Sequence, residues 1–155
     1  MTAPDHSATF TKANVAAVPE RAAQLRHEFS VWLRSHFTLD PEKVSDMVLA
    51  VNEALANAAE FAYINAPRPG AMHVRADYDT AAATLTVTVS DEGAWRNSAS
   101  DDHNPARGRG IPLIHALTDH AVIDSSPAGT HVRLRWDHVV AAPSAHAQDC
   151  GSRTT

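Results

Sequence analysis

A carboxylate and a carboxamide stand four residues apart in a segment that is otherwise alanine and leucine. Glu53 and Asn57 bound this segment, and residues at that spacing project from one face of a helix. Glutamate is a candidate general base, and the carbonyl oxygen of asparagine is a suitable ligand for a hard cation such as Mg²⁺. The pair could therefore serve one phosphate group. Neighbouring alanines would leave the backbone accessible to a bulky ligand.

A second candidate segment follows a strand-like stretch. Asp91 and Gly93 lie at its end, where the missing side chain of glycine allows close approach. A carboxylate at this position could accept a hydrogen bond from the exocyclic amine of adenine. The guanine oxygen would meet it acceptor to acceptor, so the segment predicts a testable base preference.

A third segment, Gly108-Arg109-Gly110, precedes a helical pattern. Free amides at the start of a helix bind phosphate, and Arg107 and Arg109 would add positive charge. Taken singly, the three segments also fit a solvated helix face, an ordinary turn and a flexible loop end. Their order along the chain is what favours a nucleotide site.

Composition narrows the class of protein. The chain has 155 residues, 44% of them apolar, and a formal charge of −5. This predicts a single domain and disfavours direct, non-specific nucleic-acid binding. The one cysteine, Cys150, provides no disulfide framework. The ten histidines are scattered without a familiar zinc-ligand spacing. Without a secretory pattern or a long apolar run, we expect a soluble, cytoplasmic protein with no membrane partner.

Hydrophobic periodicity predicts an α+β fold, with helices packed on one sheet. Proline begins each of the two long helical patterns, and Asp40 is an expected N-cap. The composition of 92–110 is typical of a mobile loop. The expected strands are 9–18, 72–78, 84–90, 121–124 and 131–136, and the expected helices begin at 19, 41 and about 111. We expect a flexible N-terminus over 1–7, one domain over 8–138 and a disordered tail over 139–155.

From about residue 8 to residue 136, the chain resembles the GHKL superfamily with its Bergerat nucleotide-binding fold. Within it, the likeness is to the anti-sigma-factor serine/threonine kinases of bacterial partner-switching systems. The motifs that carry the resemblance are 53–63 as the N box, Asp91-Glu92-Gly93 and 108–111 as two glycine boxes, and 129–130 as the last element. The resemblance implies a two-layer α/β sandwich, with about three helices on one face of a mostly antiparallel, mixed sheet.

The same resemblance implies a histidine-kinase-like domain that uses ATP and Mg²⁺. Glu53 would be the general base and Asn57 the metal ligand, with residues 94–108 forming a lid over ATP. The residues expected to bind the nucleotide are Asn57, Asp91, Gly93, Arg107, Gly108, Arg109, Gly110, Ile111 and Thr130.

The partners implied by the family are a sigma factor and an anti-sigma-factor antagonist that receives the phosphoryl group; a homodimer is suggested by the family alone. Two positions depart from the pattern: Phe61 replaces a histidine, and Ala106 stands where the lid carries an arginine. A sequestering module without catalysis, a plain GHKL ATPase and a histidine-phosphorylating kinase are the alternatives. Against the last, no separate dimerisation helix carries a candidate histidine.

Overall fold

The computed structural model describes residues 8–60, 62–63, 66–68, 70–93 and 105–143, with 105–110 described by their backbone alone. Three helices and seven strands occur in these residues. The helices are α1 (Pro19–His36), α2 (Pro41–Glu60) and α4 (Pro105–Leu117). The strands are β1 (Thr9–Ala16), β2 (Phe37–Thr38), β3 (Ala71–Asp79), β4 (Thr84–Asp91), β5 (His120–Ser126), β6 (Gly129–Trp136) and β7 (Val140–Ala141).

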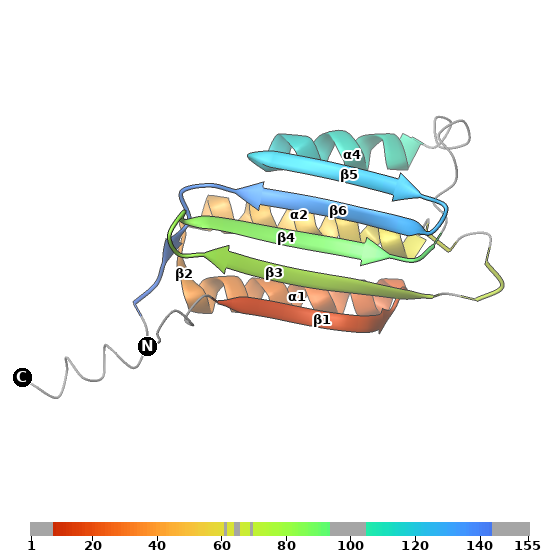
Figure 1. The fold of residues 1–155 in the computed structure, drawn as a ribbon, viewed down its shortest axis with the longest axis horizontal. Coiled ribbons are helices and arrows are strands. Elements are labelled where there is room, and N and C mark those ends of the chain that lie inside the picture. The colour runs from red at the N-terminus through yellow and green to blue at the C-terminus, as the bar shows by residue number, and fades with distance from the viewer. Residues whose placement is uncertain (1–7, 61, 64–65, 69, 94–104, 144–155) are drawn as a thin grey trace, which may run out of the picture.

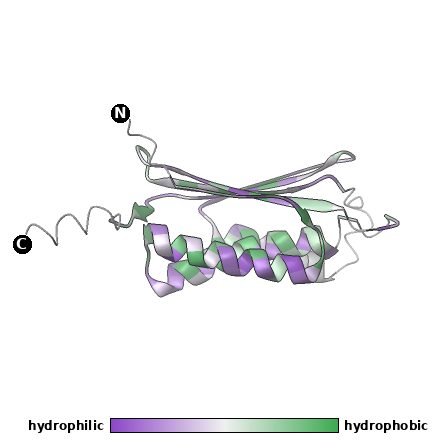
Figure 2. Ribbon diagram, turned by 90° about the horizontal axis from the view of Figure 1, so that it is seen from below, coloured by the Kyte–Doolittle hydropathy of each residue, from purple (hydrophilic) through white to green (hydrophobic). Residues whose placement is uncertain are grey.

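Five strands form one sheet in the order β1-β3-β4-β6-β5, as Figure 1 shows. Every strand pairing in the described part of the chain is antiparallel, so the mixed component that we expected is not found there. The helices lie on one side of the sheet (Figure 2), and α2 packs against both α1 and α4. The predicted α+β, two-layer architecture is confirmed.

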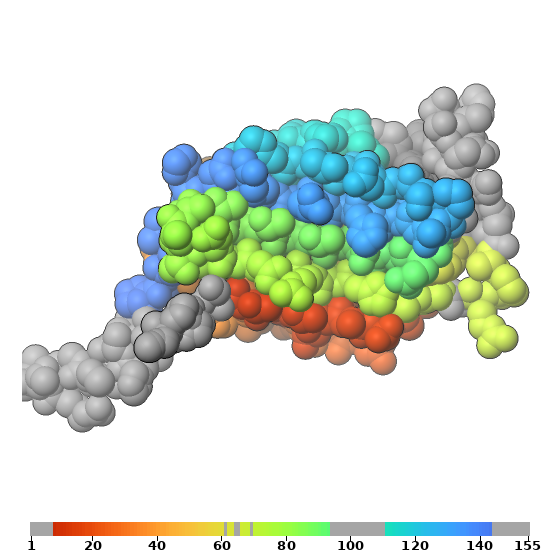
Figure 3. Space-filling model, in the orientation of Figure 1, coloured from red at the N-terminus to blue at the C-terminus, as the bar shows by residue number. Residues whose placement is uncertain are grey.

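Alternating polarity explains why the sheet is covered on one face only. Side chains at every second position of β3, β4 and β6 are buried, and those between them are partly or fully exposed. Figure 3 looks onto the face that the helices leave uncovered, where the strands lie side by side. The buried positions point towards α1 and α2, and an aromatic group made of Phe10, Phe29, Trp32, Phe37 and Tyr78 fills one region of this core.

The second helix begins as the sequence predicts. Oδ1 of Asp40 accepts the backbone N–H of Lys43 at 2.8 Å, and Pro41 occupies the first helical position. The helix runs from Pro41 to Glu60. The described segments contain no helix long and apolar enough to cross a membrane.

The prediction of a disordered tail over 139–155 is wrong for the first residues of that segment. Val139 is buried and accepts a hydrogen bond from the hydroxyl of Tyr78, and strand β7 pairs with β2. Two-residue strands carry no periodic signal, which is why the sequence did not indicate them. Residues 1–7 and 144–155 lie outside the described residues, so the predictions for them are untested.

The third helix begins earlier than the sequence predicts. Helix α4 starts at Pro105, six residues before the expected start, so 105–110 are not part of a loop. Proline is favoured at the first position of a helix, because its φ is already helical and an N–H is not needed there. The sequence predicts loop conformations for the two glycines of the third candidate segment, whereas the structure places both inside the helix. Residues 94–104, the rest of the expected lid, lie outside the described residues.

Candidate functional site

Helix α2 presents the first pair of predicted site residues. Glu53 is half-buried, and Asn57, one turn further on, is only 4% exposed. The Nδ2 atom of Asn57 is buried without a hydrogen-bond partner among the described residues. A buried, unpaired amide costs free energy, because it has lost its hydrogen bonds to water. A polar ligand or an ordered water at this position would complete its hydrogen bonding.

The alanines around this pair have a different role from the one expected. Ala54 and Ala58 are each 1% exposed and belong to the hydrophobic core. Their small size therefore serves close packing of α2, and only Ala56 and Ala59 remain partly accessible. The expectation that the alanines as a group expose the backbone to a ligand is wrong for the two buried ones.

Two buried polar residues face the helices from the neighbouring strands β4 and β6. Asp91 is 4% exposed and Thr130 is 0% exposed, and they are direct partners in the register between these strands. Both continue the buried rows of their strands, so both project towards the helical layer. Oδ1 of Asp91 accepts the N–H of Gly93 at 2.9 Å, which fixes the turn after β4. The hydroxyl oxygen of Thr130 lies 3.4 Å from that of Ser125 on β5.

Close backbone contacts bring the end of α2 to these strand ends. A Cβ atom on Gly93 would lie 2.2 Å from the carbonyl oxygen of Ala62, two residues after α2. A Cβ atom on Gly129 would lie 2.1 Å from the backbone oxygen of Asp91. Both distances are far shorter than an ordinary van der Waals contact, so neither position has room for a side chain. We call the region where the end of α2 meets the ends of β4 and β6 the candidate site; its predicted residues are Asn57, Asp91, Gly93 and Thr130.

Substituting Gly129 with alanine is expected to destabilise the protein by about 2–4 kcal/mol, since it combines a steric clash with an unfavourable φ of +150°. Chemical denaturation measures the effect. The control is Ala128→Gly in the same turn, where an exposed side chain is removed and a change of about 1 kcal/mol or less is expected. Equal stability of the Gly129 variant and the wild type would contradict the packing described here.

The third predicted segment is placed differently from the expectation. Gly108, Arg109 and Gly110 lie within the first two turns of α4, which packs against α2. Backbone N–H groups beyond the first turn bond to carbonyls four residues earlier, so these amides are not the free ones that phosphate binding requires. Ile111 is partly buried against the core. The side chains of Arg107 and Arg109 are outside the described part of the structure.

Tyr63 is a site neighbour to which the sequence assigned no role. Its hydroxyl donates to the carbonyl oxygen of Ala71 at 2.6 Å and accepts the N–H of Glu92 at 3.0 Å. Burial raises the pKa of Tyr63, so the hydroxyl keeps its proton and remains a donor at neutral pH. The ring lies against Gly70, where a Cβ atom would be 2.4 Å away. No local pattern predicts these contacts, because the partners come from separate elements.

Comparison with known families identifies the domain. The family described as "Histidine kinase-like ATPase domain" matches residues 15–136, most of the chain. The chain belongs to this family. The match covers all of the candidate site, so the ATPase domain contains Glu53 and Asn57 on α2 as well as the ends of β4 and β6.

Solved structures support the same fold. One is the RsbU and RsbW domains of Rv1364c from Mycobacterium tuberculosis, with a TM-score of 0.65 and 21% identity over 88% of this chain. Another is the histidine kinase domain of the blue-light activated histidine kinase from Erythrobacter litoralis EL346, with a TM-score of 0.50 and 21% identity over 62% of this chain. The matches span 34% and 45% of those two chains. No curated protein matches the sequence.

Proposed function

We propose that this ATPase domain is a cytoplasmic anti-sigma-factor kinase that transfers the γ-phosphoryl group of ATP to a serine or threonine of an anti-sigma-factor antagonist. Its second partner would be a sigma factor. The observation that carries the proposal is the set of buried polar residues at the candidate site, Asn57, Asp91 and Thr130, within a domain of this family. The motif resemblance and the likeness to a chain with an RsbW domain support this choice.

The residues present fit Mg²⁺ and ATP. The unpaired Nδ2 of Asn57 requires an acceptor, which a phosphate oxygen or an ordered water would supply, while Oδ1 of the same amide is a ligand suited to Mg²⁺. The metal would neutralise charge on the phosphates. Asp91 and Thr130 would contact the base, and Gly93 would admit it closely. Glu53 would accept the proton of the attacking hydroxyl.

A second candidate is a sequestering module that binds ATP without transferring phosphate. It is favoured by the two sequence departures, Phe61 and Ala106, because phosphoryl transfer depends on positioning and on charge stabilisation. A plain ATPase would hydrolyse ATP without any antagonist. The three functions share ATP binding and differ in what happens to the γ-phosphate.

The first test measures nucleotide binding. Titration calorimetry with ATP and Mg²⁺ is expected to give saturable binding, and Asn57→Ala is expected to weaken it by about 10-fold or more. The same variant is expected to fold with a stability within about 1 kcal/mol of the wild type, because Nδ2 has no partner to lose.

The matched control is Asn52→Ala on the same helix. Its Oδ1 accepts a long, 3.5 Å hydrogen bond from Arg26 on the exposed side of α1 and α2, away from the candidate site. We expect no change in its ATP affinity. Equal affinities for wild type and Asn57→Ala would reject the assigned role, and an absence of ATP binding by the wild type would overturn the proposed function.

A further inference from the structure

Glu92 has two polar contacts, one through its backbone and one through its side chain. Its N–H donates to the hydroxyl of Tyr63, in the segment after α2, at 3.0 Å. On the uncovered side, its Oε2 atom lies 2.7 Å from Nε2 of His73 on β3. Glu92 stands between Asp91 and Gly93, so both contacts act on the turn that carries the proposed adenine-binding carboxylate.

The tautomer of His73 follows from its other neighbour. Nδ1 accepts the backbone N–H of Asn14 at 2.9 Å and therefore carries no proton. The neutral ring has its proton on Nε2, which donates to Glu92. Asn14 has a φ of 58° and lies where β1 shifts its register against β3, between Lys12 and Val15. The irregularity of this edge strand thus gives His73 a fixed orientation.

The four hydrogen bonds form a continuous series. It runs from the N–H of Asn14 to His73, from His73 to Glu92, from the N–H of Glu92 to Tyr63, and from Tyr63 to the carbonyl oxygen of Ala71. It joins the edge strand, the turn after β4 and the segment after α2. Each bond is between 2.6 and 3.0 Å long, which is normal for strong hydrogen bonds.

We propose that Tyr63 and His73 are positioning residues, which hold Glu92 and thereby fix Asp91 and Gly93 in the geometry that receives the base of the nucleotide. This inference rests on the proposed function, because it concerns the same site. Tyr63 is expected to contribute more to this positioning than His73. Its hydroxyl bonds to the backbone of the turn, whereas His73 contacts only the side chain of Glu92. Neither residue touches the reacting atoms.

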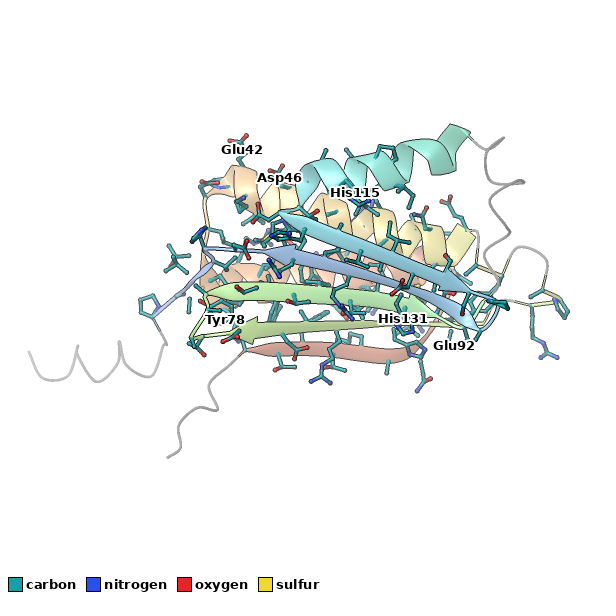
Figure 4. The ribbon with its side chains drawn as sticks, turned by 45° about the horizontal axis from the view of Figure 1, so that its top comes forward. Glu42, Asp46, Tyr78, Glu92, His115 and His131 are labelled. Carbon is teal, nitrogen blue, oxygen red and sulfur yellow. The ribbon has the colours of Figure 1, made fainter. Side chains whose placement is uncertain are left out.

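The decisive comparison is between Tyr63→Phe and Tyr78→Phe. Both remove a hydroxyl that donates to a backbone carbonyl, Ala71 for the first and Val139 for the second. Figure 4 shows Tyr78 and Glu92 at opposite ends of the sheet. We expect Tyr63→Phe to weaken binding of ATP and of adenosine by the same factor, about 10-fold, because the base is the moiety that both share. Tyr78→Phe is expected to bind as the wild type does.

Substitution of His73 provides a second comparison. His73→Ala is expected to weaken ATP and adenosine binding by about threefold, in the same direction as Tyr63→Phe. His131 is the control, because it is exposed on the same face, near Glu92 (Figure 4), and its side chain has no hydrogen bond or ion pair with the described residues. His131→Ala is expected to leave both affinities unchanged.

Amide hydrogen exchange separates this inference from the proposed function, because it needs no nucleotide. Tyr63→Phe removes the acceptor of the Glu92 N–H, so exchange at Glu92 is expected to become about 10-fold faster or more, and Tyr78→Phe is expected to leave it unchanged. Equal exchange in the two variants would overturn the positioning role, as would equal nucleotide affinities. If the wild type fails to bind ATP, the proposed function is lost and the positioning role in base binding with it, even if the exchange result shows that the turn is held.

Discussion

Glu53→Gln is expected to slow phosphoryl transfer by about 10² to 10⁴-fold and to leave the affinity for ATP within about threefold of the wild type. Glutamine has the size of glutamate but accepts no proton from an attacking hydroxyl. The half-buried position of Glu53, one turn before Asn57, places the carboxylate beside the proposed metal ligand without making it part of the core. The measurement is the transfer of labelled γ-phosphate from ATP to an anti-sigma-factor antagonist of the same organism, with ADP formation as the second readout.

The control for this prediction is Glu60→Gln. Glu60 is the last residue of α2 and is exposed, so its loss changes the charge of the helix by the same amount without affecting a proposed catalytic group. Its transfer rate is expected to match that of the wild type. If Glu53→Gln transfers phosphate at the wild-type rate, Glu53 is not the general base. Partner release that still depends on ATP in that variant would favour the sequestering module.

Periodicity was sufficient to predict the main layers. The alternating residues of 84–90 became β4 because one face of the sheet is covered by helices and the other is not. The buried side of α1 includes Leu25, Phe29 and Leu33, because their spacing places them on one face of the helix. These elements depend on local patterns that a single sequence contains in full.

Glycine was a poor guide to the start of α4. Gly108 and Gly110 lower the propensity for a helix, but by only about 1 kcal/mol each, and packing of α4 against α2 can outweigh that amount. Pro105 provided the better signal, because proline is favoured at the first helical position. The helix therefore begins before the segment in which the sequence predicts free, phosphate-binding amides.

The candidate site was only partly predictable. Spacing on one helix related Glu53 to Asn57, yet spacing did not reveal that Asn57 is buried while Glu53 is half-exposed. The register that pairs Asp91 with Thr130 arises from the contact of two strands that are separated by α4 and β5 in the sequence. Tyr63 and His73 depend on contacts between elements in the same way. Such tertiary contacts leave no local pattern.

Asp91→Asn is expected to reduce the discrimination between ATP and GTP by at least about 10²-fold. If the wild-type site is built around a hydrogen bond from adenine to Asp91, its preference for ATP is expected to be about 10⁴-fold. Asparagine keeps an oxygen that can accept the N–H of Gly93, a 2.9 Å hydrogen bond in the wild type, so the turn is retained. Its amino group is a hydrogen-bond donor, so it would face the amine of adenine donor to donor but could donate to the oxygen of guanine. ATP affinity should therefore fall while GTP affinity rises.

The matched control for this substitution is Asp79→Asn, in the turn between β3 and β4. Oδ1 of Asp79 accepts the backbone N–H groups of Ala81 and Ala82 at 3.0 and 3.2 Å, so it organises its turn as Asp91 does, but at the far end of the same strand pair. Calorimetry with both nucleotides should give unchanged affinities for this control. If Asp91→Asn and Asp79→Asn discriminate equally well between ATP and GTP, base recognition lies elsewhere. A preference for GTP over ATP in Asp91→Asn alone would assign base recognition to the Asp91 carboxylate, because the substitution replaces only one oxygen of that group.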